Sequence, residues 1–257
     1  SAASDVYKRQ VMHPLCNVLS ILAIACSFVL PVSSLRAGTP MSDRVAVEAG
    51  VRTELAKDLA LPPPALSDLS GRRCLDGRPV DGVQGEVVEY WANLECSYCG
   101  IQEVIRAQRE DSNLCIVVRH APAEAYGESL KKALCYEALH SFSVNAAHRF
   151  WDAVVPRTEL GIPAPYEGIL QAALQEAAIA PEAFGEALRT ASTLVSADMF
   201  AARSRITSTP TYVLQGIRFP ACDFTAAQLR HALELADRAR SGDAEAGERI
   251  VEMITHG

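Results

Sequence analysis

Apolar residues in this chain form short β-like runs and longer helical stripes. The runs at 87–91 and 115–118 are apolar and rich in β-branched and aromatic residues, which predicts two buried strands. Between them, Ile101, Val104 and Ile105 share one face of a helix. Strand, helix and strand in this order predict a right-handed parallel β-α-β unit.

A second β-like region lies nearer the C-terminus. Residues 211–214 and 217–219 flank Gln215-Gly216, which predicts a hairpin. Thr225 and Gln228 then have the spacing of a capping box, so a helix is expected to begin there and close the domain. Its apolar stripe comprises Leu229, Ala232, Leu233 and Ala236.

Only helical patterns occur between Pro122 and Thr209. An i+4 stripe comprises Leu130, Leu134, Ala138 and Phe142. Pro181 suits the first turn of a helix over 182–190, and residues 194–202 continue the helical pattern. The sequence therefore predicts an α/β core, residues 70–122 and 206–257, interrupted by an all-helical insertion, residues 123–205.

The N-terminal 37 residues have the pattern of an export signal. Leu15 to Leu30 is almost wholly apolar and precedes small residues, so we expect a signal peptide cleaved after Ala37. The apolar run is short for a membrane span, which needs ~20 residues, but an uncleaved anchor is an open alternative. Residues 1–11, upstream of Met12, are interpreted as an assembly scar.

Residues 38–69 are predicted to form a leader before the core. Val45 to Leu59 has the apolar spacing of an amphipathic helix, and the three prolines at 62–64 are expected to end it. The leader either packs on the domain or serves as a flexible tether.

Charge and cysteine content narrow the classes of function. Removing Asp5, Lys8, Arg9 and Arg36 from the totals of 24 basic and 31 acidic side chains leaves a net charge of −9. Such a surface is a poor partner for nucleic acid. Export to an oxidising compartment would allow structural disulfides among the cysteines outside the signal segment and the Cys-x-x-Cys motif, with three possible pairings. Those cysteines are Cys74, Cys115, Cys135 and Cys222.

The pair Cys96 and Cys99 directly follows the first predicted strand. We expect Cys96 at the N-terminus of the next helix, where unpaired amides and the helix dipole favour a thiolate. The alternatives are a structural zinc half-site and an inert disulfide. Zinc needs four ligands, and the chain has no second Cys-x-x-Cys or His-x-His, so we interpret the pair as a redox site without metal or cofactor.

Three segments in order resemble the DsbA-like branch of the thioredoxin superfamily over residues 70–240. They are Cys96-Ser97-Tyr98-Cys99 after a strand, residues 117–122 before the helical insertion, and residues 208–213 opening a later strand. The resemblance implies a thioredoxin-like fold and a cis Thr209–Pro210 bond that faces Cys96 across a substrate groove. Thr209, Pro210 and Tyr98 are therefore candidate substrate-binding residues.

Two departures from the family pattern concern redox tuning. An acidic residue often lies six positions before the first cysteine, whereas Glu89 lies seven before Cys96. A one-residue bulge would absorb the offset, or Glu95 takes a different role; both alternatives stay open. The dipeptide between the cysteines is Ser-Tyr rather than Pro-His, which affects the expected oxidant strength. His120, Cys135, Tyr90 and Trp91 are interpreted as structural.

The resemblance implies a periplasmic thiol–disulfide oxidoreductase that introduces disulfides into folding exported proteins. A membrane partner of the DsbB type would reoxidise it. The nearest rival is a disulfide reductase or isomerase, kept reduced by a membrane donor of the DsbD type. A rival of another class is a non-catalytic peptide-binding chaperone or assembly factor.

Overall fold

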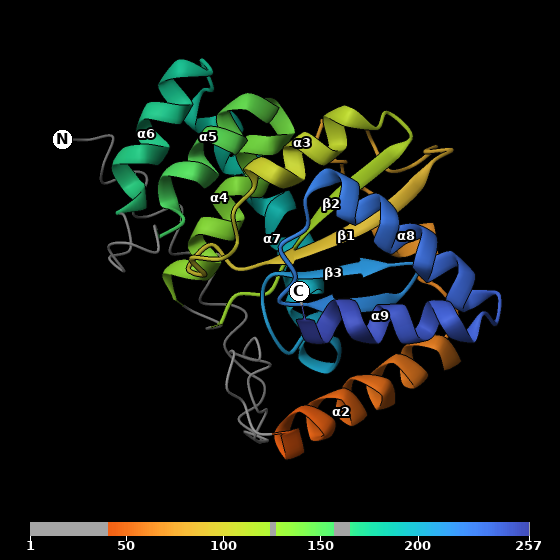
Figure 1. Ribbon diagram of the computed structural model, residues 1–257. Coiled ribbons are helices and arrows are strands. Elements are labelled where there is room, and N and C mark those ends of the chain that lie inside the picture. The colour runs from red at the N-terminus through yellow and green to blue at the C-terminus, as the bar shows by residue number, and fades with distance from the viewer. Residues whose placement is uncertain (1–40, 124–126, 157–164, 257) are drawn as a thin grey trace.

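The computed structural model describes residues 41–123, 127–156 and 165–256 (Figure 1). The expected signal segment, with Cys16 and Cys26, lies outside these residues. In the described part of the chain, no helix combines the length and the apolar character that crossing a membrane requires.

A four-stranded sheet forms the centre of the core. Strand β1 (Glu86–Ala92) leads through α3 (Gln102–Glu110) to β2 (Leu114–His120), and the two strands pair in parallel, as predicted. Strands β3 (Thr211–Leu214) and β4 (Ile217–Pro220) form the expected hairpin, and β3 pairs with β1 antiparallel. The strand order is β2-β1-β3-β4.

Successive side chains of a strand point to opposite faces of the sheet, and helices pack on the sheet to cover them. Helices α3 and α8 (Ala226–Arg240) pack against each other and contact β2 and β3, respectively, whereas α7 (Pro181–Arg205) packs on β2. The predicted capping box forms at Thr225 and Gln228, and the apolar stripe of α8 is buried. This arrangement is a thioredoxin-like α/β fold with an all-helical insertion.

The insertion contains α4 (Glu128–Phe142), α5 (Val144–Val154), α6 (Tyr166–Glu176) and α7. Helices α4, α5 and α6 gather at one end of the sheet, whereas α7 packs against β2 (Figure 1). Pro181 occupies the first turn of α7, as predicted. The two helical segments expected at 182–190 and 194–202 form one continuous helix because no helix-breaking residue separates them.

The sequence analysis expected α8 to close the domain, and this expectation is wrong. Helix α9 (Ala244–His256) follows and packs against both α8 and α2 (Met41–Ala60), the predicted leader helix (Figure 1). On α2, Asp58 accepts hydrogen bonds from the backbone and side chain of Arg218 in β4. The leader helix therefore packs on the domain, and its Asp58 satisfies a backbone amide of the edge strand β4.

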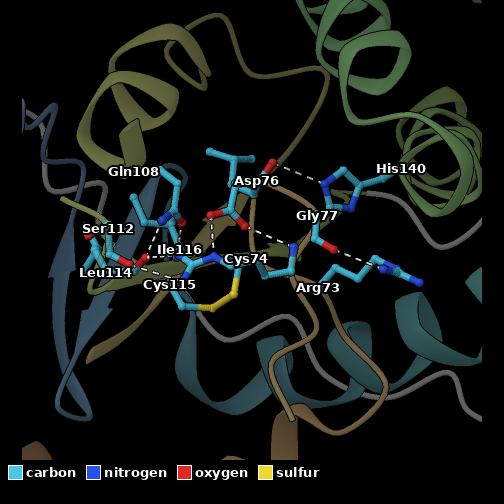
Figure 2. The surroundings of a disulfide bond; sticks show 12 residues. Arg73, Cys74, Asp76, Gly77, Gln108, Ser112, Leu114, Cys115, Ile116 and His140 are labelled. Atoms are coloured by element: carbon cyan, nitrogen blue, oxygen red, sulfur yellow. Dashed lines mark hydrogen bonds and ion pairs between the residues drawn. A yellow bond between two sulfur atoms is a disulfide. The ribbon is translucent and has the colours of Figure 1, made fainter. Parts of the chain in front are cut away.

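A disulfide attaches the segment before β1 to the other edge of the sheet. Cys74 and Cys115 are bonded, with their Cα atoms 5.1 Å apart (Figure 2). Next to the bond, the Leu75 amide donates to the Ile116 carbonyl at 2.7 Å, and Arg78 donates to the Leu114 carbonyl at 2.9 Å. The sequence left the pairing of the four cysteines open; the structure joins Cys74 to Cys115, and this bond covers the β2 edge.

Buried charges join the insertion to the sheet on the α7 side. Asp198 of α7 is fully buried and accepts hydrogen bonds from the Arg72 and Arg119 guanidinium groups and, at 2.9 Å, from the His120 amide. Arg119 also donates to Glu89 at 2.6 Å. Because each buried charge has an opposite partner, the desolvation penalty is offset and α7 is held in place over β2.

Candidate redox site

The two cysteines of the motif lie in a loop between β1 and α3, residues 93–100, which we call the redox loop. The prediction that Cys96 begins a helix is wrong, because α3 begins only at Gln102. The loop instead contains turn hydrogen bonds from the Cys96 amide to the Asn93 carbonyl and from the Cys99 amide to the Cys96 carbonyl.

Competing hydrogen bonds explain the late start of α3. In a helix that began at Cys96, the carbonyls of Cys99 and Gly100 would accept backbone amides four residues further on. Here the Trp151 indole donates to the Cys99 carbonyl at 2.8 Å, and the Tyr90 hydroxyl donates to the Gly100 carbonyl at 2.9 Å. Two buried aromatic side chains therefore take the acceptors that an extended helix would need.

The two thiols differ in exposure and in acidity. Cys96 is partly exposed, whereas Cys99 is fully buried. A hydrogen bond from the Cys99 side chain lowers the pKa of Cys96 to about 6, assisted by the Thr209 side chain and the amides of Tyr98 and Cys99. Burial, followed by the neighbouring Cys96, raises the pKa of Cys99 well above its usual value. The thiolate is therefore favoured at Cys96 by local donors and not by a helix terminus.

The segment before β3 lies against Cys96. The Thr209–Pro210 peptide bond is cis, and the Cys96 thiol donates to the Thr209 carbonyl at 3.2 Å. The Thr209 carbonyl contact favours the thiol, whereas the Thr209 side chain favours the thiolate. Tyr98, the third substrate-binding candidate, is 73% exposed beside the two cysteines. The fold thus brings residues 113 positions apart into one site.

The acidic residues near the motif occupy different places. Strand β1 pairs with β2 one residue to one residue from Glu86 to Ala92, so no bulge shifts Glu89 toward the cysteines. Glu89 instead pairs with Arg119, and burial raises the pKa of its carboxyl group. The residue six positions before Cys96 is Tyr90, and its hydroxyl is bound to the redox loop.

The helical insertion holds the redox loop through residues that the sequence analysis did not select. Ser129 of α4 donates to the Asn93 side chain at 2.5 Å, and Lys132 of the same helix forms an ion pair with Glu95. Trp151 of α5 is the third contact. No local signal marks these residues, because a serine or lysine in a helical pattern is typical of a solvated face.

The geometry supports a nucleophile and a resolving thiol on one loop. A half-exposed sulfur with a lowered pKa can attack or be attacked by a partner sulfur, and a buried sulfur three residues away can displace the partner. Within the described residues, no group of three His, Cys, Asp or Glu side chains is placed to hold a metal ion.

Comparisons with known proteins give similar structures only. No protein-family model and no curated protein matches this sequence. The thiol–disulfide exchange protein α-DsbA2 from Wolbachia pipientis is 16% identical over 76% of this chain and 98% of its own, with a TM-score of 0.47. The catalytic domain of Proteus mirabilis ScsC is 12% identical over 74% and 97%, with a TM-score of 0.47.

A thioredoxin-like oxidoreductase from Silicibacter pomeroyi is 21% identical over 60% of this chain and 86% of its own, with a TM-score of 0.44. These likenesses concern the fold alone.

Proposed function

We propose that this protein is a thiol–disulfide oxidoreductase whose reacting atoms are the sulfurs of Cys96 and Cys99. In the oxidised enzyme, a substrate thiolate attacks the Cys96 sulfur, the bond to Cys99 breaks, and a mixed disulfide forms. A second substrate thiolate then attacks the substrate sulfur of that mixed disulfide and releases Cys96. The substrate gains one disulfide, and the enzyme gains the two electrons and is left with both cysteines reduced.

The observation that carries this proposal is the asymmetry of the two thiols. The pKa of Cys96 is lowered to about 6 and its sulfur is partly exposed, whereas Cys99 is fully buried with a raised pKa. An inert structural disulfide needs no such difference. An exchange enzyme needs it because the attacked sulfur must be reachable and must also be a good leaving group.

The direction of transfer that we propose is disulfide donation to folding exported proteins. A stabilised Cys96 thiolate stabilises the reduced enzyme, which makes its disulfide more oxidising. Substrates would bind as extended peptides along Thr209 and Pro210, beside the exposed Tyr98. The proposed compartment is the periplasm, and the proposed partner for reoxidation is a membrane protein of the DsbB type.

Refolding of reduced ribonuclease tests the activity. The oxidised protein should restore ribonuclease activity, and the Cys96→Ser variant should not. When the reduced proteins are instead mixed with ribonuclease that carries scrambled disulfides, the Cys96 thiolate of Cys99→Ser should attack a substrate disulfide, displace one substrate thiolate and accumulate as a mixed disulfide. Cys222→Ala removes a buried thiol outside the redox loop and is the matched control. Equal trapping by the Cys96→Ser and Cys99→Ser variants would contradict the assigned roles.

The redox state of Cys96 and Cys99 in cells decides the direction of transfer. A mostly oxidised pair supports the disulfide donor, and a mostly reduced pair supports a reductase or isomerase with a DsbD-type partner. A protein that prevents aggregation of unfolded substrates equally well after both cysteines are replaced by serine would instead be a chaperone.

A further inference from the structure

The ion pair between Lys132 and Glu95 lies beside the redox loop and has no part in the exchange steps described above. Lys132 is 1% exposed, which is rare for a lysine because burying its charge is costly without a partner. Its ammonium group contacts the Glu95 carboxylate and donates to the Val154 carbonyl at 3.0 Å. The lysine thus reaches from α4 to the loop while also contacting the end of α5.

Glu95 is the residue directly before Cys96. The Cα atoms of successive residues are about 3.8 Å apart, so the two side chains leave the redox loop from adjacent positions. Two adjacent negative charges repel each other, and an unneutralised carboxylate would disfavour the thiolate. The side chain of Glu95 is 23% exposed, so solvent screens its charge only in part.

The same face of α4 contacts the loop a second time, one turn earlier. Ser129 donates to the Asn93 side chain, which also accepts the Glu95 amide at 2.9 Å. The backbone amide of Asn93 in turn donates to the Cys99 sulfur at 3.5 Å. Residues three apart on a helix share a face, so Ser129 and Lys132 act together on the segment that carries both cysteines.

We propose that Lys132 is a positioning residue of the redox site: its buried ammonium group neutralises and holds the Glu95 carboxylate, and the Cys96 thiolate depends on that neutralisation. This inference rests on the proposed exchange function of Cys96. It assigns to the helical insertion a role in setting the reactivity of the nucleophile, beyond covering the core.

The test of this proposal removes the charge of Lys132 and the charge of Glu95, each alone and then both together. Lys132→Met keeps the aliphatic side chain and removes the charge, so the lone Glu95 carboxylate should raise the pKa of Cys96 by about one unit. Glu95→Gln removes the negative charge and should shift that pKa downward. The double variant Lys132→Met/Glu95→Gln should return it to within a few tenths of a unit of the parent value.

The measurement is the pH dependence of Cys96 alkylation by iodoacetamide in the reduced full chain, with the modified peptide quantified by mass spectrometry. The equilibrium of the Cys96–Cys99 pair with glutathione is the second readout. Lys132→Met should make the enzyme disulfide less oxidising, and the double variant should recover the parent equilibrium. Lys131→Met is the control, because Lys131 is on the same helix but pairs with Glu128 at the surface.

If the Lys132–Glu95 ion pair served only to stabilise the fold, the variants would shift the pKa of Cys96 in a different pattern. If both single variants shift the Cys96 pKa in the same direction, or if Lys132→Met leaves it unchanged in a folded protein, the inference is wrong. Circular dichroism checks the fold, and Glu95→Gln alone remains informative if Lys132→Met does not fold. A parent protein that neither oxidises reduced ribonuclease nor reduces ribonuclease disulfides, yet shows the opposite shifts, would contradict the exchange function and leave this electrostatic role intact.

Discussion

Removing the disulfide between Cys74 and Cys115 should cost this protein a large share of its stability. Both cysteines are fully buried, and the bond closes a loop with a sequence separation of 41 residues. In the chain-entropy model, a crosslink over a loop of that length lowers the free energy of folding by about 4 kcal/mol, because the unfolded chain loses conformations. Single domains are stable by only about 5–15 kcal/mol in total.

The perturbation is the variant Cys74→Ala/Cys115→Val, made together with Cys96→Ser and Cys99→Ser so that the redox pair cannot reshuffle disulfides. Alanine and valine keep the small apolar cluster around the bond filled, including Leu69 and Val80. Urea unfolding followed by circular dichroism gives the free energy of unfolding and its denaturant dependence. That dependence should rise as well, since an unfolded chain without the crosslink exposes more surface.

Non-additivity provides a sharper test than the size of the loss. Either single replacement breaks the same crosslink, so Cys74→Ala alone and Cys115→Val alone should each cost nearly as much as the double variant. Hydrogen exchange should also become faster at the Leu75 amide, which donates to the Ile116 carbonyl beside the bond. A double variant that loses less than about 1 kcal/mol, or single losses that simply add, would refute the reasoning.

Three further predictions concern charge. The folded pKa of Cys96 is about 6, so the reduced protein should gain stability relative to Cys96→Ser as the pH rises from 6 to about 9. This difference in stability should disappear below pH 6, and urea unfolding of both proteins measures it. Burial lowers the pKa of His148 to about 4, so on acidification the unfolded state binds the proton first and the stability falls between about pH 6.5 and pH 4. His148→Gln should flatten this dependence of stability on pH, and an unchanged dependence would contradict the prediction. Asp198→Asn leaves the buried Arg72 without a carboxylate partner and removes one of the two carboxylates that pair with Arg119, so it should cost about 3 kcal/mol or more. Asp243→Asn at the surface should cost about 1 kcal/mol or less, and equal losses would count against the buried cluster.

Local patterns were sufficient for most of the fold. The apolar strands, the hairpin at Gln215-Gly216, the capping box at Thr225 and the helical insertion each depend on residues close in sequence, and all of them form as predicted. Helix α9 was missed at the C-terminus, and the start of α3 was placed too early. The start of α3 is decided by Trp151 and Tyr90, whose donors take the carbonyls that a longer helix needs.

For the candidate site, the sequence by itself determined the chemistry: a Cys-x-x-Cys motif after a strand is a pair of thiols on one short loop, whatever surrounds it. Only the tertiary structure decided how the two thiols differ. It buries Cys99, places Thr209 beside Cys96 across 113 residues of chain, and brings Lys132 to Glu95 from another helix. Burial and charge pairing depend on which distant segments meet, and no pattern of neighbouring residues records that.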